Sequence, residues 1–178
     1  MPRFSQNFLV NKNLLPKIIQ AADLSSQDIV VEIGPGRGVL TEKLCQTAKQ
    51  VIAFEIDNRL LSTLSRLQQK YPNLQIINAD FNKINWRQHL PSNCIYKIVA
   101  NIPYHVTGLI FRNIFQVGQT LPQCAVLMIQ YEVAKKIVPD EHNLSILSNL
   151  ITSYGQPKIV CRVSKNSFRP IPQVDSLS

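Results

Sequence analysis

Apolar runs rich in valine and isoleucine alternate along the chain with longer segments that have helical length and spacing. The apolar runs are Ile29–Ile33, Val51–Ile56, Leu74–Ile77, Ile95–Ala100, Ala125–Ile129 and Ile159–Val163. Continuous runs of this kind are typical of strands buried on both faces. The segments expected to be helical are Val39–Ala48, Asn58–Lys70, Thr107–Gln116, Tyr131–Val138 and Leu144–Tyr154. This alternation predicts an α/β fold, with right-handed crossovers and helices on both faces of a mainly parallel sheet.

The length and composition fit a single domain. With 178 residues, 45% of them hydrophobic, the chain can bury a substantial core. The longest uninterrupted apolar run, Cys124–Ile129, is too short to span a bilayer, and Met1–Asn7 lacks the apolar core of a signal peptide. The cysteines and histidines are dispersed and predict neither a metal site nor a disulfide framework. We therefore expect a cytoplasmic protein without membrane contact.

The chain is basic, with a formal net charge of +8. Cationic side chains neutralise phosphates and release counterions, so this charge suits a polyanionic partner. A basic surface that only maintains solubility is the alternative. Residues 156–178 contain Asp175 as their single acidic residue and four basic ones, Lys158, Arg162, Lys165 and Arg169. This local excess favours a nucleic acid.

A glycine-rich loop, Gly34–Gly38, follows the first apolar run and precedes a predicted helix. Glycines let the backbone turn sharply and approach a ligand. Their Gly-x-Gly-x-Gly spacing differs from the Gly-x-Gly-x-x-Gly of dinucleotide binders. Glu55 ends the next run, 21 positions after Gly34, where a carboxylate can accept hydrogen bonds from both hydroxyls of a ribose. A nicotinamide cofactor would also fit this pair of features.

The third run leads to Asp80, whose carboxylate could accept a hydrogen bond from the amino group of an adenine. Phe81 and Ile56 could then sandwich the adenine ring. A turn capped by Asp80 is the structural alternative.

The fourth run, Ile95–Ala100, is followed by Asn101-Ile102-Pro103-Tyr104. It places an amide, a rigid turn and an aromatic ring at the carboxyl end of a strand, where ligands bind in open α/β sheets. This combination suits attack by the exocyclic amine of an adenine on a methyl donor. Alternatively, Pro103 only stops the strand and Tyr104 packs in a core.

The glycine loop, Glu55, Asp80 and Asn101 sit at the ends of successive predicted strands. This layout resembles the Rossmann-like fold of class I S-adenosylmethionine-dependent methyltransferases. Four ordered segments look more specifically like the ribosomal RNA adenine N6,N6-dimethyltransferase family. They are Phe4–Leu9, Val31–Gly36, Asn101–Tyr104 and Phe168–Ser176, and the likeness runs nearly end to end.

The resemblance implies S-adenosyl-L-methionine as the cofactor. Asn7 and Leu9 would close over its methionine end, with Gly34, Gly36 and their loop beneath it. Glu55 would hold the ribose. Asp80 would hold the adenine, between Phe81 and Ile56.

The resemblance also implies roles at the substrate. Asn101 would bridge cofactor and substrate, since its side-chain oxygen and the Ile102 carbonyl are placed to accept the two hydrogens of adenine N6. That arrangement concentrates the nitrogen lone pair and aims it at the methyl group. Because the target base must leave its stack, it needs flat apolar walls. Tyr104 is one candidate wall, and the resemblance offers Phe168 as the other.

The leading hypothesis is an enzyme that methylates adenine N6 twice per base in small-subunit ribosomal RNA, acting as a monomer on a pre-ribosomal subunit. The alternatives are a large-subunit enzyme conferring antibiotic resistance, a non-catalytic RNA-binding assembly module and, more distantly, a nicotinamide-dependent oxidoreductase. Members of the family continue into a last strand and a small helical domain. We expect residues 1–178 to be a catalytic domain, either a fragment or a shortened form, with an incomplete final strand and without the C-terminal helical domain.

Overall fold

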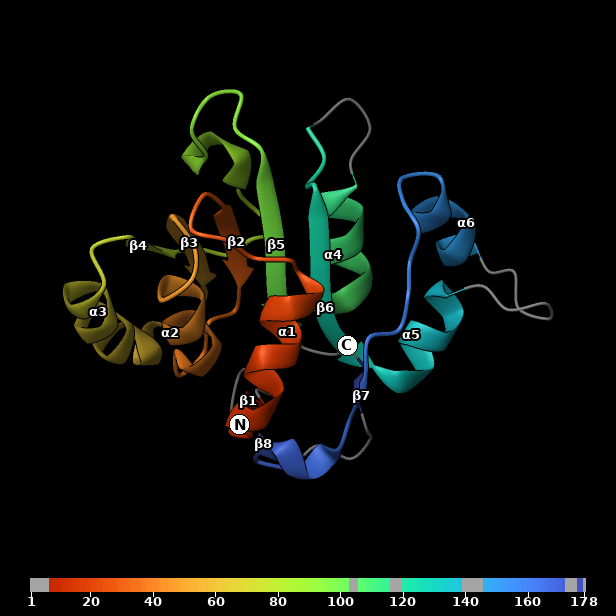
Figure 1. The fold of residues 1–178 in the computed structure, drawn as a ribbon, viewed down its shortest axis with the longest axis horizontal. Coiled ribbons are helices and arrows are strands. Elements are labelled where there is room, and N and C mark those ends of the chain that lie inside the picture. Colours follow the sequence, from red (N-terminus) through yellow and green to blue (C-terminus); the bar gives the residue numbers. More distant parts are fainter. Residues whose placement is uncertain (1–6, 103–105, 116–119, 139–145, 172–175, 178) are drawn as a thin grey trace.

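Five parallel strands form the centre of the molecule in the computed structural model, which describes residues 7–102, 106–115, 120–138, 146–171 and 176–177 (Figure 1). The parallel strands are β2 Ile29–Ile33, β3 Gln50–Glu55, β4 Leu74–Asn78, β5 Tyr96–Asn101 and β6 Cys124–Gln130. Two short antiparallel strands complete the sheet, in the order β4-β3-β2-β5-β6-β9-β7. They are β7 Arg162–Val163 and β9 Ser176–Leu177. The predicted mainly parallel α/β sheet is confirmed.

Helices connect the strands and cover both faces of the sheet (Figure 1). The α-helices are α1 Leu15–Ala21, α2 Val39–Cys45, α3 Leu61–Lys70, α4 Thr107–Ile114, α5 Tyr131–Ile137 and α6 Ile146–Thr152. The 3-10 turns are η1 Lys12–Leu14, η2 Asn58–Leu60, η3 Trp86–His89 and η5 Lys165–Ser167. None of the helices in the described ranges combines the length and hydrophobicity that a membrane span requires.

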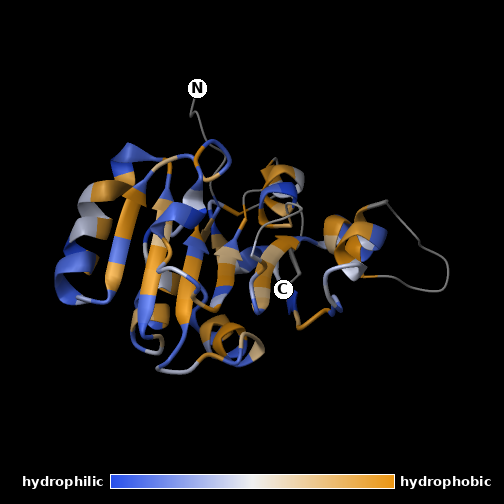
Figure 2. Ribbon diagram, turned by 90° about the horizontal axis from the view of Figure 1, so that it is seen from above, coloured by the Kyte–Doolittle hydropathy of each residue, from blue (hydrophilic) through white to orange (hydrophobic). Residues whose placement is uncertain are grey.

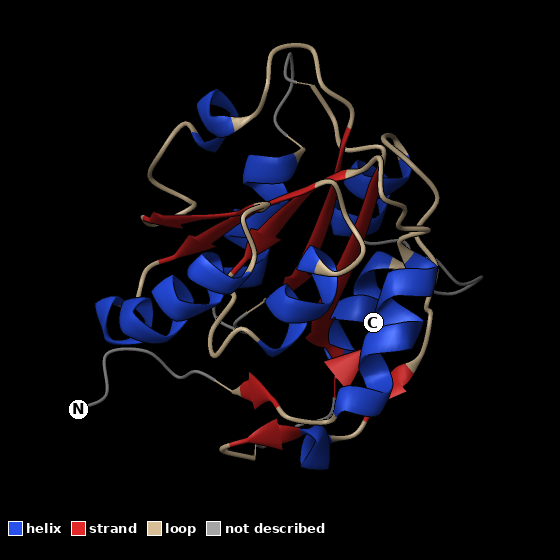
Figure 3. Ribbon diagram, turned by 60° about the vertical axis from the view of Figure 1, so that its left-hand side comes forward, coloured by secondary structure: helices blue, strands red, loops and turns tan. Residues whose placement is uncertain are grey.

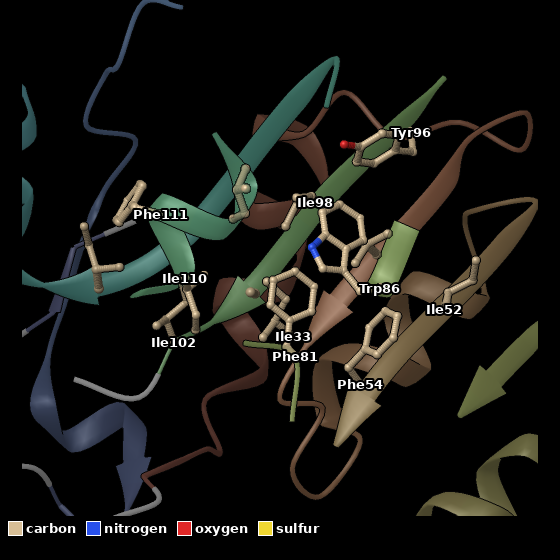
Figure 4. Close-up of a cluster of buried hydrophobic side chains, with 14 of the residues drawn as sticks. Ile33, Ile52, Phe54, Phe81, Trp86, Tyr96, Ile98, Ile102, Ile110 and Phe111 are labelled. Carbon is tan, nitrogen blue, oxygen red and sulfur yellow. The ribbon is translucent and has the colours of Figure 1, made fainter. Parts of the chain in front are cut away.

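Alternate side chains of the central strands enter two separate cores, because successive residues of a strand point to opposite faces. Val30 packs with α1 and α2, whereas Val31 and Ile33 pack with η3 and α4. Figure 2 shows the hydrophobic residues concentrated along the strands. Figure 4 shows the second core, in which the Phe81 ring stacks on Trp86 at 4.9 Å between ring centroids. Burial of both strand faces explains the uninterrupted apolar runs.

The strand register brings the carboxyl ends of the central strands to one edge. Ile33 of β2 lies opposite both Phe54 of β3 and Ala100 of β5. From β2 the chain adds β3 and β4 on one side, and it adds β5 and β6 on the other. This reversal between β2 and β5 is the topological switch point at which open α/β sheets bind ligands.

A separate two-stranded sheet joins the amino-terminal arm to the carboxyl-terminal region (Figure 3). β1 Phe8–Leu9 pairs antiparallel with β8 Phe168–Arg169, so that Leu9 lies opposite Phe168. The arm therefore lies packed against the domain, and two sequence segments of the predicted site become neighbours.

Several of the strand predictions were wrong in part. The run Leu74–Ile77 was predicted to be buried on both faces, but β4 is an edge strand and only its first residue, Leu74, is buried. The run Val51–Ile56 extends beyond β3, which ends at Glu55, and Ile56 is 42% exposed.

The run Ile95–Ala100 was predicted to be a strand, but Ile95 is 72% exposed and β5 begins at Tyr96. The segment Ile159–Val163 was predicted to be a strand buried on both faces, but only its last two residues form β7, and Ile159 is 46% exposed. The physical reason is its position, because β7 ends the sheet and pairs only with β9, so Ile159 and Val160 have no strand beside them to complete a buried layer.

Candidate functional site

A cavity of about 760 Å³ opens at the carboxyl ends of β2, β3 and β5. Its size is that of a small-molecule or cofactor site. The predicted site residues that line it are Asn7, Leu9, Gly34, Gly36, Glu55, Ile56, Asp80, Phe81, Asn101, Ile102 and Phe168. Tyr104 lies outside the described residues. The fold thus gathers into one cavity residues that are up to 161 positions apart in the sequence.

The glycine loop turns beneath this cavity with a backbone that favours glycine. Gly34 and Gly36 have φ angles of +72° and +61°, in the left-handed region. A Cβ atom at Gly36 would lie 3.0 Å from a carbon of the Phe8 ring. The left-handed backbone and the tight space beside Phe8 therefore both favour glycine at position 36.

Glu55 is a buried carboxylate whose orientation is fixed by the backbone. One of its oxygens accepts a hydrogen bond from the Gly36 N–H at 3.0 Å, and the other accepts from the Asp57 N–H at 2.9 Å. Burial raises the pKa of Glu55, and these backbone donors partly offset that increase. Each oxygen has a further lone pair, so the carboxylate can still accept hydrogen bonds from a ligand.

Glu32 is a candidate site residue that reasoning from the sequence missed. It lines the cavity and is 1% exposed, and its Oε2 atom has no hydrogen-bond partner among the described residues. Burial raises the pKa of Glu32 to about 8. The Thr41 hydroxyl opposes this increase, although its geometry falls short of a hydrogen bond, and the charge of Glu55 adds to it. The sequence did contain a signal for this residue, because Glu32 is a charged residue inside the apolar run Ile29–Ile33. A buried carboxylate without a partner is energetically costly, so its presence in such a run indicates a function.

Asp80 caps a turn and also lines the cavity, and its role toward an adenine stays a prediction. Its Oδ1 atom accepts a hydrogen bond from the Asn82 N–H at 3.0 Å, so it does cap a turn. Its Oδ2 atom lies 3.7 Å from the exposed Lys83 ammonium, and the residue also lines the cavity. Capping and ligand binding are therefore compatible at Asp80.

The two residues predicted to flank an adenine have different surroundings. Ile56 is 42% exposed at the cavity. Phe81 is buried, with Trp86 stacked on its ring and Phe54 against its edge at 5.5 Å. Phe81 thus belongs to the core as well as to the cavity wall. Its place in an adenine sandwich stays a prediction.

Asn101 ends β5 and is tied to the amino-terminal arm. Its side-chain nitrogen donates a hydrogen bond to the Asn7 carbonyl at 3.2 Å. This bond uses the nitrogen, so the side-chain oxygen keeps its capacity to accept from a ligand. The Ile102 N–H donates to the Met128 carbonyl at 3.0 Å and continues the pairing of β5 with β6 beyond the strand. The backbone that carries Asn101 is therefore held from two sides.

Phe168 lines the same cavity from β8, beside the arm. It is 1% exposed, and the neighbouring Ser167 carbonyl accepts the Val10 N–H at 2.9 Å. The arm and β8 are thus joined by main-chain hydrogen bonds around the cavity. Among the described residues no group of histidine, cysteine and acidic side chains is arranged to hold a metal ion.

Comparison with known proteins gives a consistent result. A family model described as ribosomal RNA adenine dimethylase matches residues 1–177. The Ribosomal RNA small subunit methyltransferase A of Dehalococcoides mccartyi strain BAV1 is 42% identical over 171 residues, which are 96% of this chain and 58% of that protein. The protein of the same name from Mycoplasmopsis pulmonis is 40% identical over 176 residues, 98% of this chain and 67% of that protein.

Two solved structures are similar to this chain in both sequence and fold. A dimethyladenosine transferase from Plasmodium falciparum is 38% identical with a TM-score of 0.81, covering 96% of this chain and 61% of that chain. The 23S rRNA methyltransferase ErmE is 30% identical with a TM-score of 0.80, covering 96% of this chain and 67% of that one. The chain thus spans about three fifths of the length of the Dehalococcoides mccartyi relatives.

Proposed function

Because the chain belongs to the ribosomal RNA adenine dimethylase family, we propose that it forms the catalytic part of a small-subunit ribosomal RNA methyltransferase. The complete protein would transfer methyl groups from S-adenosylmethionine to adenine N6 and form N6,N6-dimethyladenosine. It would act in the cytoplasm, as a monomer, on ribosomal RNA within a pre-ribosomal subunit. The observation that carries this proposal is the fixed position of Asn101 at a cavity that also contains Glu55.

The residues of the cavity fit S-adenosylmethionine. This molecule supplies a methyl group activated by a positively charged sulfonium, and it also carries an ammonium group and two ribose hydroxyls. Glu55 presents oriented acceptors to such hydroxyls. Glu32 places in the same cavity a buried carboxylate whose Oε2 atom has no hydrogen-bond partner among the described residues, and a cationic ligand would favour its ionised form. The glycine loop leaves room for close approach of the backbone.

The target amine needs two acceptors. The Asn101 side-chain oxygen and the Ile102 carbonyl would accept the two N6 hydrogens, which concentrates the nitrogen lone pair and orients it toward the methyl carbon. The nitrogen–carbon bond would form as the methyl group leaves its sulfonium sulfur, and the amine would then lose a proton to water. No strong general base is needed, since the amine becomes acidic as that bond forms. Phe168 would supply one apolar wall for the extruded base.

The choice of the small subunit follows from the relatives. The curated relatives matched at 38–42% identity over nearly the whole chain carry the name Ribosomal RNA small subunit methyltransferase A, whereas the 23S rRNA methyltransferase ErmE is 30% identical. The test is methyl transfer by the full-length protein to unmodified small and large ribosomal subunits, followed by primer-extension mapping. Small-subunit labelling alone is expected, and labelling of the large subunit alone would contradict the proposal.

A non-catalytic assembly module is the second candidate. It would share the fold and the basic charge, but it would have no need for oriented Glu55 and Asn101 side chains. Calorimetry separates the two functions, because an assembly module would show no binding of S-adenosylmethionine by the full-length protein.

A further inference from the structure

A second groove, of about 500 Å³, lies on the surface formed by α1, α2 and α3, which are neighbours on one face of the sheet (Figure 1). We call it the basic groove. Five basic side chains line it, namely Lys12, Arg37, Lys43, Arg66 and Lys70. Glu42 is the one acidic residue in its lining. The groove therefore holds a local charge excess of four, half of the formal charge of the chain.

The single acid neutralises only part of this charge. Glu42 lies 2.6 Å from the Lys70 ammonium and accepts a hydrogen bond from the Tyr71 hydroxyl at 3.1 Å. The Lys70 and Tyr71 hydrogen bonds lower the pKa of Glu42, so it is ionised and engaged. Lys43 and Arg66 form no ion pair with any residue in the described part of the chain. Their like charges raise the potential of the groove and attract a polyanion.

The basic groove is continuous with the cofactor cavity. Arg37 and Val39 line both. The Arg37 guanidinium lies over the Phe8 ring, 4.8 Å from its centroid, so it is placed at the boundary between them. A nucleic-acid strand that places one nucleotide in the cavity can thus continue along α2 without crossing the sheet.

We propose that the basic groove binds the phosphodiester backbone of the RNA strand that flanks the target adenine. This inference rests on the proposed function. Phosphate contacts of this kind set the register of an RNA without reading its sequence. The lining favours RNA over a protein partner because it contains no aromatic residue, and aromatic anchors characterise protein interfaces. Gln46 and Thr63 add uncharged hydrogen-bond donors for phosphate oxygens.

The test compares two doubly neutralised forms of the full-length protein. Lys43→Gln/Arg66→Gln removes two charges from the basic groove and leaves Arg37 intact. Lys49→Gln/Arg112→Gln removes two exposed charges away from the groove, one near the amino end of β3 and one on α4, which packs on the other face of the sheet. The measurements are the affinity for protein-free small-subunit ribosomal RNA at several salt concentrations, the KM for unmodified subunits and the Kd for S-adenosylmethionine.

We expect the groove variant to bind protein-free RNA roughly tenfold more weakly and to raise the KM, with kcat and the cofactor Kd unchanged. The slope of log affinity against log salt should fall by about 0.7 for each single-strand phosphate that the variant no longer neutralises. The control variant should match the wild type. Equal RNA affinity and slope in the groove variant and the wild type would overturn the proposal. A defect on intact subunits but not on protein-free RNA would also overturn it, since the groove would then bind a ribosomal protein.

A charge-conserving variant, Lys43→Arg/Arg66→Lys, guards against misfolding. It should retain RNA binding, and if its affinity falls as far as that of the neutralised form, the charge is not the cause. If the wild type transfers no methyl group but the groove variant still binds RNA more weakly, the proposed function is wrong, whereas the inference that the basic groove binds RNA is retained.

Discussion

Replacing Glu32 by glutamine should make the protein more stable at neutral pH, by an amount that grows as the pH rises. The carboxyl group is 1% exposed, and its Oε2 atom has no hydrogen-bond partner among the described residues. Burial raises its pKa to about 8, whereas the unfolded chain ionises it near the ordinary value of 4.5. Between these two values the folded protein holds a proton that the unfolded chain has released. Stability contributed by this group is therefore complete below pH 4.5 and is lost progressively until about pH 8.

The size of the effect follows from that window. Where the folded state holds one proton more than the unfolded state, the free energy of unfolding falls by about 1.4 kcal/mol per pH unit. From about pH 5 to about pH 7 the wild type should therefore lose roughly 2–3 kcal/mol through Glu32. Glutamine has nearly the same shape and cannot ionise, so the Glu32→Gln variant lacks this loss.

Urea unfolding of both proteins at several pH values measures the difference. We expect it to increase steadily from about pH 5 to about pH 7 in favour of the variant. Glu42→Gln is the matched control, because that carboxylate is partly exposed, its pKa is lowered, and its ion pair contributes little. If the difference in unfolding free energy between Glu32→Gln and the wild type is constant over this pH range, Glu32 does not retain its proton in the folded protein and the prediction is wrong.

Three further substitutions test other parts of the structure. Gly36→Ala forces a Cβ to within 3.0 Å of Phe8 at a φ of +61°, so the calorimetric Kd for S-adenosylmethionine should rise about tenfold; an unchanged Kd would show that the loop does not shape the cofactor site. Asn101→Ala should lower kcat by roughly 10²–10³ with little change in cofactor affinity, measured by methyl transfer under saturating cofactor. Lys97→Met removes a buried ammonium that lies 3.2 Å from Asp28, so urea unfolding should show a loss of about 3 kcal/mol. Because this pair lies at the amino ends of the strands, kcat should not change.

Periodicity and composition predicted the centre of the sheet because its strands are buried on both faces. Ile29–Ile33 is a strand with the predicted bounds, and all five of its residues are buried. The same reasoning failed at Ile159, where the apolar run reaches the edge of the sheet and has no covering layer. An apolar run shows that a segment can be buried, but its position in the sheet decides whether it is.

The site residues that lie at the ends of strands could be predicted from the sequence. Gly34 directly follows β2, and Glu55 and Asn101 are the last residues of β3 and β5, so sequence order alone places them at one edge of the parallel sheet. The pairing of Leu9 with Phe168 was not predictable from local pattern, because it joins segments far apart in sequence. The resemblance supplied both residues as site members without showing that they pair. Glu32 was overlooked because its neighbours so clearly indicate a buried strand.

Under the proposed function, the residues of this cavity catalyse N6,N6-dimethylation of adenine in small-subunit ribosomal RNA. The most direct measurement is mass spectrometry of nucleosides from unmodified small-subunit RNA after reaction with the full-length protein and S-adenosylmethionine, with Asn101→Ala in parallel. We predict N6,N6-dimethyladenosine with the wild type and almost none with the variant. Absence of methylated adenine with the wild type, or equal product from both proteins, would contradict the account.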